Sequence, residues 1–341
     1  MTLSPTYIPK RTRRGFALLA ALWLVVMIAT AGLQFAQVAR DRRHLGLISA
    51  DRSREMAALD GALAMVLARL DADAARSAND RQGASRAFSR VVPLAVDPWR
   101  QVSDRFVLPL VVGADSVAVL TTDLGTVVNV NLASELELTT LIEAITGDAA
   151  RARRTAQSIL DWRDPDTLPR PLGAEAEQYA SAGFPVRPAN SAFRTLDDLH
   201  DVVSISPELL DQLRPYLTTD GAVRRINLNA APDVVLRTLP GMTEPLLTAI
   251  LALRTRNRRV ESIPALLSAV RSAARTGNGS GSGERDALAR ALTDAVTLEV
   301  NDVAFRLTAN PASTAQPLSL MAVIRRNADG TSTVTSRRWL P

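Results

Sequence analysis

Apolar residues form one unbroken block near the start of the chain and then return at a helical period. Phe16–Ala36 carries no charged residue, and as a helix it would span roughly 30 Å, the thickness of a bilayer's hydrocarbon core. Further on, apolar side chains recur as one stripe of an amphipathic helix: Met56, Leu59, Leu63, Val66, Leu67 and Leu70. The pattern predicts one helix from Phe16 to about Asp73, and the alternative is a membrane helix followed by a separate helix.

Short β-like runs lie on both sides of a long helical region. Ser77–Ala87 is polar and predicts a loop, and the segments with strand character are Ser89–Val96, Phe106–Val112, Ser116–Thr122, Val296–Val300, Ala304–Thr308, Leu318–Ile324 and Thr331–Ser336. Between them, Leu132–Val270 has helical patterns interrupted by a proline-rich loop at Pro165–Pro188, and Arg275–Arg285 predicts a Gly/Ser linker. The order predicts an α+β chain in which a helical domain is inserted into an antiparallel sheet.

The helical region contains an internal repeat. Two segments align without gaps at the residue pairs Asn129/Asn227, Asn131/Asn229, Ala133/Ala231, Leu138/Leu236 and Leu141/Leu239. The second copy resembles a helix-hairpin-helix unit around Pro240-Gly241-Met242-Thr243, which raises the alternative of a membrane-anchored, competence-type DNA-binding protein. DNA-binding hairpins of this kind carry a second glycine where this chain has Thr243, and its bulk hinders close phosphate approach. The nearby cations Arg254, Arg256, Arg258 and Arg259 suit a solvated helix end equally well.

Composition removes several chemistries. The chain has no cysteine, so disulfides, zinc–thiolate sites, iron–sulfur clusters and thiol nucleophiles are excluded. His44 and His200 are its only imidazoles, and no serine lies in a nucleophile elbow. We therefore expect no enzyme and no catalytic residue. Most of the net charge of +5 comes from a basic leader, Lys10–Arg14, so it indicates targeting more than nucleic-acid binding.

The junction between leader and apolar block carries a specific signal. Arg13-Arg14-Gly15-Phe16 resembles a type IV prepilin signal, which implies cleavage after Gly15 by prepilin peptidase and N-methylation of Phe16. The competing interpretation is a secretory signal peptide cleaved near Ala29-Thr30-Ala31.

A second series of residues strengthens the pilin interpretation. Asp161-Trp162-Arg163-Asp164-Pro165-Asp166, Gly173-Ala174-Glu175, Tyr179, Asn190, Phe193, Leu196 and Leu199 are similar to the signature of type II secretion system protein K, the largest minor pseudopilin. The resemblance implies a pilin-like helix and sheet with an inserted α-helical domain. It implies an inner-membrane, single-pass protein of a Gram-negative bacterium, with its bulk in the periplasm, that supports pseudopilus assembly and protein export. The implied partners are the I- and J-type minor pseudopilins at the filament tip and the major pseudopilin.

The expected divisions of the chain follow from these patterns: leader 1–15, transmembrane helix 16–36, periplasmic helix 37–76, first sheet part 77–127, inserted domain 128–290 and second sheet part 291–341. Most pilins carry a glutamate at the fifth mature position, where this chain has Ala20. A tip subunit has no further amine for such a carboxylate to meet, and a buried carboxylate without a partner is costly. We expect Ala20 and the stripe from Met56 to Leu70 to pack against partner subunits.

The acidic part of the signature also suggests a metal. Asp161, Asp164, Asp166 and Glu175 offer hard oxygen ligands on a Pro/Gly-rich loop, as calcium prefers. The resemblance implies calcium in the inserted domain, although the spacing is not that of an EF-hand. The alternative is that these carboxylates cap helices and pair with Arg163 and Arg170.

Overall fold

The protein is described here from a computed structural model covering residues 14–86, 99, 109–113, 115–222, 225–273, 282–310, 317–327 and 329–340. It divides into two compact units, Met1–Ala57 and Ala58–Pro341. The expected strand Ser89–Val96 and the start of Phe106–Val112 lie outside the described residues.

Helix α1 runs from Arg14 to Arg86. Over Leu18–Ala72 it is the one helix among the described residues that is long and apolar enough to cross a membrane by length and composition. The single continuous helix was predicted, but the loop expected at Ser77–Ala87 was wrong, because α1 continues to Arg86. That segment has three alanines and two arginines, which favour a helix, and no proline to interrupt it.

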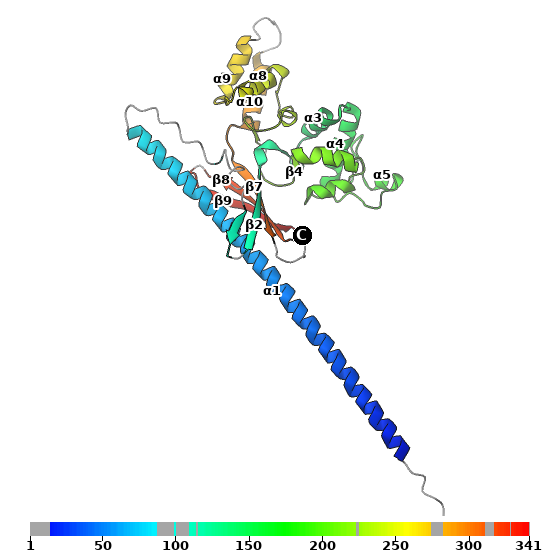
Figure 1. Cartoon of the computed structure of the whole chain (residues 1–341). Coiled ribbons are helices and arrows are strands. Elements are labelled where there is room, and N and C mark those ends of the chain that lie inside the picture. The colour runs from blue at the N-terminus through cyan, green and yellow to red at the C-terminus, as the bar shows by residue number, and fades with distance from the viewer. Residues whose placement is uncertain are drawn as a thin grey trace, which may run out of the picture. The chain divides into compact units, whose positions relative to one another are not determined.

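The second unit contains a five-stranded antiparallel sheet (Figure 1). Its order is β1-β2-β7-β8-β9, and the strands span Leu110–Val112, Asp115–Asp123, Asp302–Asn310, Ser319–Arg326 and Ser332–Leu340. The strands expected at Ser116–Thr122, Ala304–Thr308, Leu318–Ile324 and Thr331–Ser336 are confirmed. The expectation at Val296–Val300 was too long, since β6 (Val296–Thr297) pairs outside this sheet.

One face of the sheet packs on α1. In β7, Val303, Phe305 and Leu307 are buried on this face, whereas on the other face Arg306 is exposed and Ala304 is buried in a small separate cluster. The buried side chains from α1 and from the strands form one hydrophobic core.

Between β2 and β7 the chain forms an insertion with a separate core. Its helices are α3 (Glu135–Thr146), α4 (Ala149–Arg163), α5 (Ala176–Ser181), α6 (Pro207–Leu213), α7 (Asp233–Leu236), α8 (Glu244–Thr255), α9 (Ile263–Ala273) and α10 (Ser282–Ala295). Single 3₁₀ turns lie at Leu124–Thr126, Leu196–Asp201 and Arg214–Tyr216. Helix α10 begins inside the linker expected at Arg275–Arg285, and the rest of that linker lies outside the described residues.

The internal repeat is also a repeat of structure. In the first copy, β3 (Val128–Asn129) pairs in parallel with β4 (Leu217–Thr218), and in the second, β5 (Ile226–Asn227) pairs in parallel with β6. In each copy the first asparagine accepts a hydrogen bond from the backbone N–H of the second, at 2.8 Å for Asn129 and 3.0 Å for Asn227. This side-chain bond fixes the turn that leads from strand to helix.

The second asparagine of each copy ties that turn to a distant segment. Asn131 Nδ2 donates to the carbonyl of Phe193 and its Oδ1 accepts from the N–H of Phe193, at 2.9 and 2.8 Å. Asn229 exchanges the same two bonds with Val260, at 3.0 and 2.8 Å. A buried backbone group is costly without a partner, so these asparagines determine where each copy closes.

An arginine completes each copy. Arg163, the last residue of α4, donates to the carbonyls of Val130 and Ala133. Arg254, near the end of α8, donates to the corresponding carbonyls of Leu228 and Ala231. The two copies therefore have the same structure. The matching asparagines indicated this from the sequence, and the equivalent arginine contacts are a further shared feature.

Candidate functional site

The acidic loop follows α4 in the first copy. Asp161, in the last turn of that helix, is fully buried, and its carboxylate accepts hydrogen bonds from the backbone and the guanidinium of Arg170. Gly173 passes so close that a Cβ there would lie 1.9 Å from Asp161 Oδ2. The loop therefore returns over the end of α4, and only glycine fits at the point of contact.

Three carboxylates converge beside this point. Asp164, Asp166 and Glu175 each present an oxygen within 4.8 Å of the others. Asp164 Oδ2 pairs with Arg170 at 2.5 Å, whereas Asp164 Oδ1 and Glu175 Oε1 are buried without a hydrogen-bond partner. Two buried acceptors without donors are costly, and a bound cation would satisfy both.

Glu175 is the carboxylate of this cluster whose pKa is raised. Burial raises the pKa of Glu175 above its ordinary value, and the neighbouring charges of Asp161, Asp164 and Asp166 raise it further, while Arg170 lowers it. At Glu175 the repulsion from the three aspartates thus outweighs the attraction of Arg170. Such a group favours either a proton or a cation.

The four predicted ligands do not act alike. Asp164, Asp166 and Glu175 come together, but Asp161 lies outside this group because Arg170 engages it. The alternative of arginine pairing therefore describes Asp161 and one oxygen of Asp164. Arg170 was expected only as a partner in that alternative, and nothing in the sequence indicates that it bridges two aspartates.

Aromatic side chains hold the loop on the first copy. Trp162 stacks on Phe193 with ring centroids 6.0 Å apart, and Tyr179 lies 6.1 Å from Trp162. The hydroxyl of Tyr179 accepts from the N–H of Val203 at 3.2 Å. These contacts fix both ends of the loop, so the carboxylates are positioned by the module rather than by their own pairing.

The apolar stripe of α1 has a different role from the one expected. Leu59, Leu63, Val66 and Leu70 are buried against the chain's own sheet, so the prediction that they pack on partner subunits was wrong. Leu67 is half-buried on the same core, and Met56 is exposed. Periodicity indicates which face of a helix is covered but not by what, and here the covering surface is intramolecular.

The N-terminal candidates lie at the start of α1. Gly15 and Phe16 fall in its first residues, and Ala20 is exposed. The structure describes no partner there, so cleavage, methylation and packing stay predictions.

Part of the basic cluster that suggested DNA binding makes hydrogen bonds within the protein. Arg254 donates to backbone carbonyls, as described above, and Arg259 donates to the carbonyl of Leu298 at 2.7 Å. Burial lowers the pKa of Arg254. Two of the four arginines thus serve the second copy's own structure, which leaves Arg256 and Arg258 exposed.

Comparison with known proteins gives matches to one family. Residues 116–219 match the family model of type II secretion system (T2SS) protein K. Type II secretion system protein K of Pectobacterium carotovorum subsp. carotovorum is 31% identical over 113 residues, which are 32% of this chain and 31% of that protein. The chain thus aligns with about a third of that relative's length.

Among solved structures, the chain is similar to one from the GspK-GspI-GspJ complex of the enterotoxigenic Escherichia coli type 2 secretion system. The identity is 17%, the TM-score is 0.47, and the match covers 68% of this chain and 82% of that one. The family match begins in β2 and ends just after β4, so it contains the acidic loop and the whole first copy. The resemblance of this chain to type II secretion system protein K, predicted from its sequence, is confirmed.

Proposed function

We propose that this chain is a minor pseudopilin of a type II secretion system and that its role is structural rather than enzymatic. It is anchored in the inner membrane by α1, with the sheet and the insertion in the periplasm. The observation that carries the proposal is the family match over the first copy, together with an apolar α1 whose later part packs on an antiparallel sheet.

Processing gives the most direct test. Prepilin peptidase cuts after Gly15 and leaves Phe16 as a methylated N-terminus. Sequencing the N-terminus of the mature membrane protein should give Phe16, and Gly15→Val should leave the leader attached. A mature N-terminus near residue 32 would show ordinary signal-peptidase cleavage and contradict the proposal.

The partners are the I- and J-type minor pseudopilins and the major pseudopilin. Since the stripe Leu59–Leu70 is covered by the sheet, we propose that the opposite face of α1 meets the partner helices. That face presents Ala64, Met65 and Ala68, all exposed, with Met65 44% accessible. Small residues let two helices approach closely, and one Met adds apolar area.

Two substitutions separate this face from the core. Met65→Asp should weaken assembly with the partner subunits and block secretion while the protein remains folded. Leu63→Asp should instead unfold the sheet, because Leu63 is 6% accessible and lies in the core. Co-purification with the partners and thermal melting measure the two effects. If Met65→Asp assembles normally with the partner subunits, this face of α1 is not part of the interface.

We further propose that the acidic cluster holds calcium. Asp164, Asp166 and Glu175 would be its ligands, and Asp161 would orient Arg170 beside it. Calcium takes oxygen ligands in flexible geometry, as a loop supplies. The two buried carboxylate oxygens without donors support the proposal. Bound calcium would also offset the mutual repulsion that raises the pKa of Glu175.

Glu175→Gln tests the site with little change of shape. Calcium should raise the melting temperature of the wild-type protein, by an amount equivalent to about 2.7 kcal/mol at a hundredfold excess over Kd. Glu175→Gln should lose this gain while its metal-free stability stays equal or rises, because a repelled charge is gone. Glu177→Gln, an exposed change on the same helix, should keep the gain. No calcium shift in the wild type would leave the carboxylates as caps and ion pairs.

A further inference from the structure

The sheet and the insertion have separate hydrophobic cores. One core joins α1 to the sheet, and the other fills the insertion. Among the described residues, the two cores are bridged by a small apolar cluster in which Leu124 and Val127 meet Ala304 and Val323, with Met321 packed on it. Leu124–Val127 is also the connection by which the chain enters the insertion. Few apolar contacts therefore resist a rotation about this segment.

An open cavity of about 510 Å³ lies beside that cluster, whose side chains form part of its wall. The strands contribute Thr122, Arg306 and Met321 to its lining, and the insertion contributes Thr195, Pro215 and Thr218, among others. The insertion thus packs on the outer face of the sheet only at this cluster among the described residues, and an open cavity lies between the two beside it.

Arg338 of β9 reaches across this cavity. Its guanidinium donates to the carbonyl of Arg194 and to the hydroxyl of Thr219. It pairs with the Asp220 carboxylate at 3.1 Å. All three acceptors belong to the insertion, so one side chain of the sheet binds three points on the other body.

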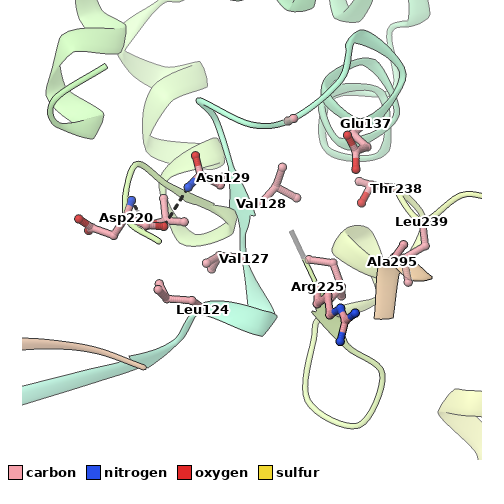
Figure 2. Close-up of a pocket in the computed structure, with 13 residues that line it drawn as sticks. Leu124, Val127, Val128, Asn129, Glu137, Asp220, Arg225, Thr238, Leu239 and Ala295 are labelled. Carbon is pink, nitrogen blue, oxygen red and sulfur yellow. Dashed lines mark hydrogen bonds between the residues drawn. The ribbon is translucent and has the colours of Figure 1, made fainter. Parts of the chain in front are cut away.

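The acceptor side is held firmly. Figure 2 shows Asn129 directed at the backbone of Asp220, where its Nδ2 donates to the carbonyls of Asp220 and Gly221, both at 2.9 Å. Asp220 is therefore fixed to the first copy through the same asparagine that shapes its strand–helix turn. Burial raises the pKa of Asp220 although the charges of Arg338 and Arg306 lower it, so its charged form is disfavoured at this position.

We infer that Arg338 is a latch that holds the insertion over the outer face of the sheet, and that the insertion pivots about Leu124–Val127 when the latch opens. The Arg338 side chain is 31% accessible and the Asp220 side chain 12%. A partly exposed ion pair contributes little net stability, so this one can open without unfolding either body. Opening would uncover the sheet face that carries Arg306 and Met321.

The neighbouring arginine supplies a matched control. Arg337 lies on the same strand but turns to the other face, where it pairs with Asp60 of α1 and lies over the ring of Trp339. Arg337→Ala thus removes the same charge from the same strand without touching the insertion.

Distances between spin labels test the pivot. Because the chain has no cysteine, the full-length protein in detergent can be labelled at Leu120→Cys on the sheet and Leu136→Cys on α3, both exposed. Pulsed electron paramagnetic resonance should show a broader distribution with a new, longer distance in Arg338→Ala. Asp220→Asn should show the same change, and Arg337→Ala should match the wild-type background.

A second labelled pair, at Leu136→Cys and Arg153→Cys, reports on the first copy itself and should not change in any variant. An unchanged Leu120–Leu136 distribution in Arg338→Ala would overturn the latch. An equal change in Arg337→Ala would do the same. A change in the second pair would also overturn it, because the insertion would then be unfolding rather than moving as a body.

Discussion

Tyr179, which packs against the acidic loop, is buried, and its burial has a measurable effect on its pKa and on the stability of the protein. It is fully buried between Trp162 and Phe184, and burial raises its pKa to about 12 although the Val203 N–H, donating to its hydroxyl, lowers it. A raised pKa means that the neutral hydroxyl is the stable form in the folded protein. The stability it contributes is complete below pH 10 and is lost as the pH rises through about 12.

The alkaline titration of this protein should therefore show Tyr179 clearly. The chain has three tyrosines and its one lysine lies in the leader, so few groups ionise in this range. Absorbance of the tyrosinate against pH should contain a step near 12 that is absent in Tyr179→Phe and present in Tyr216→Phe. At pH 7 the free energy of unfolding of Tyr179→Phe should be about 1 kcal/mol lower than that of the wild type, because the hydrogen bond from Val203 is lost. A wild-type titration complete by pH 11 would contradict the burial.

Gly173 gives a second test at this scale. Its Cα approaches Asp161 so closely that Gly173→Ala would force a methyl into the carboxylate. We expect a loss of about 1–3 kcal/mol in the free energy of unfolding. Gly183→Ala would not be a suitable control because Gly183 has a positive φ of 71°, so Ala182→Gly on the exposed end of α5 is used instead. Equal melting curves for wild type and Gly173→Ala would show that the loop does not close over α4.

The elements were largely predictable because each carries a period of its own. The alternation Val303-Ala304-Phe305-Arg306-Leu307 indicates a strand, and the charge-free run from Phe16 indicates a spanning helix. What the pattern could not give is the identity of the covering surface, as the stripe at Leu59–Leu70 shows. The candidate ligands show a related limit: three of the four converge, but spacing along the loop does not reveal that Asp161 pairs with Arg170.

The paired asparagines make a prediction about both copies of the module. Asn131→Ala removes a side chain that satisfies one backbone N–H and one carbonyl, and Asn229→Ala removes one that satisfies one N–H and the carbonyls of Val260 and Leu298. Each should lower the free energy of unfolding by about 1–3 kcal/mol. Denaturant titration of the two variants measures this. A loss in one variant and none in the other would show that the two copies do not close alike.

At the scale of the whole molecule, the proposed pseudopilin function leads to a prediction about the insertion. A second body of this size on the sheet hinders close helical packing, and Ala20 offers no carboxylate to a following subunit. We therefore expect the chain to cap a filament and not to polymerise by itself. Overproduced alone, it should form no pili by electron microscopy, and in excess it should shorten existing ones. Finding it at regular intervals along a filament would contradict the tip position.

The pairing of β2 with β7 has a consequence for the order in which the chain folds. These neighbouring strands are separated by the entire insertion, so closing the sheet requires a contact between residues far apart in sequence, which is slow. The insertion's own contacts are more local, and during synthesis it emerges before β7. The insertion should therefore fold first. Until the sheet forms, the apolar side of α1 between Leu59 and Leu70 has no strands packed on it. For that interval the newly made chain presents an uncovered hydrophobic helix face, so the time before β7 pairs with β2 is when this protein is most exposed to aggregation and proteolysis.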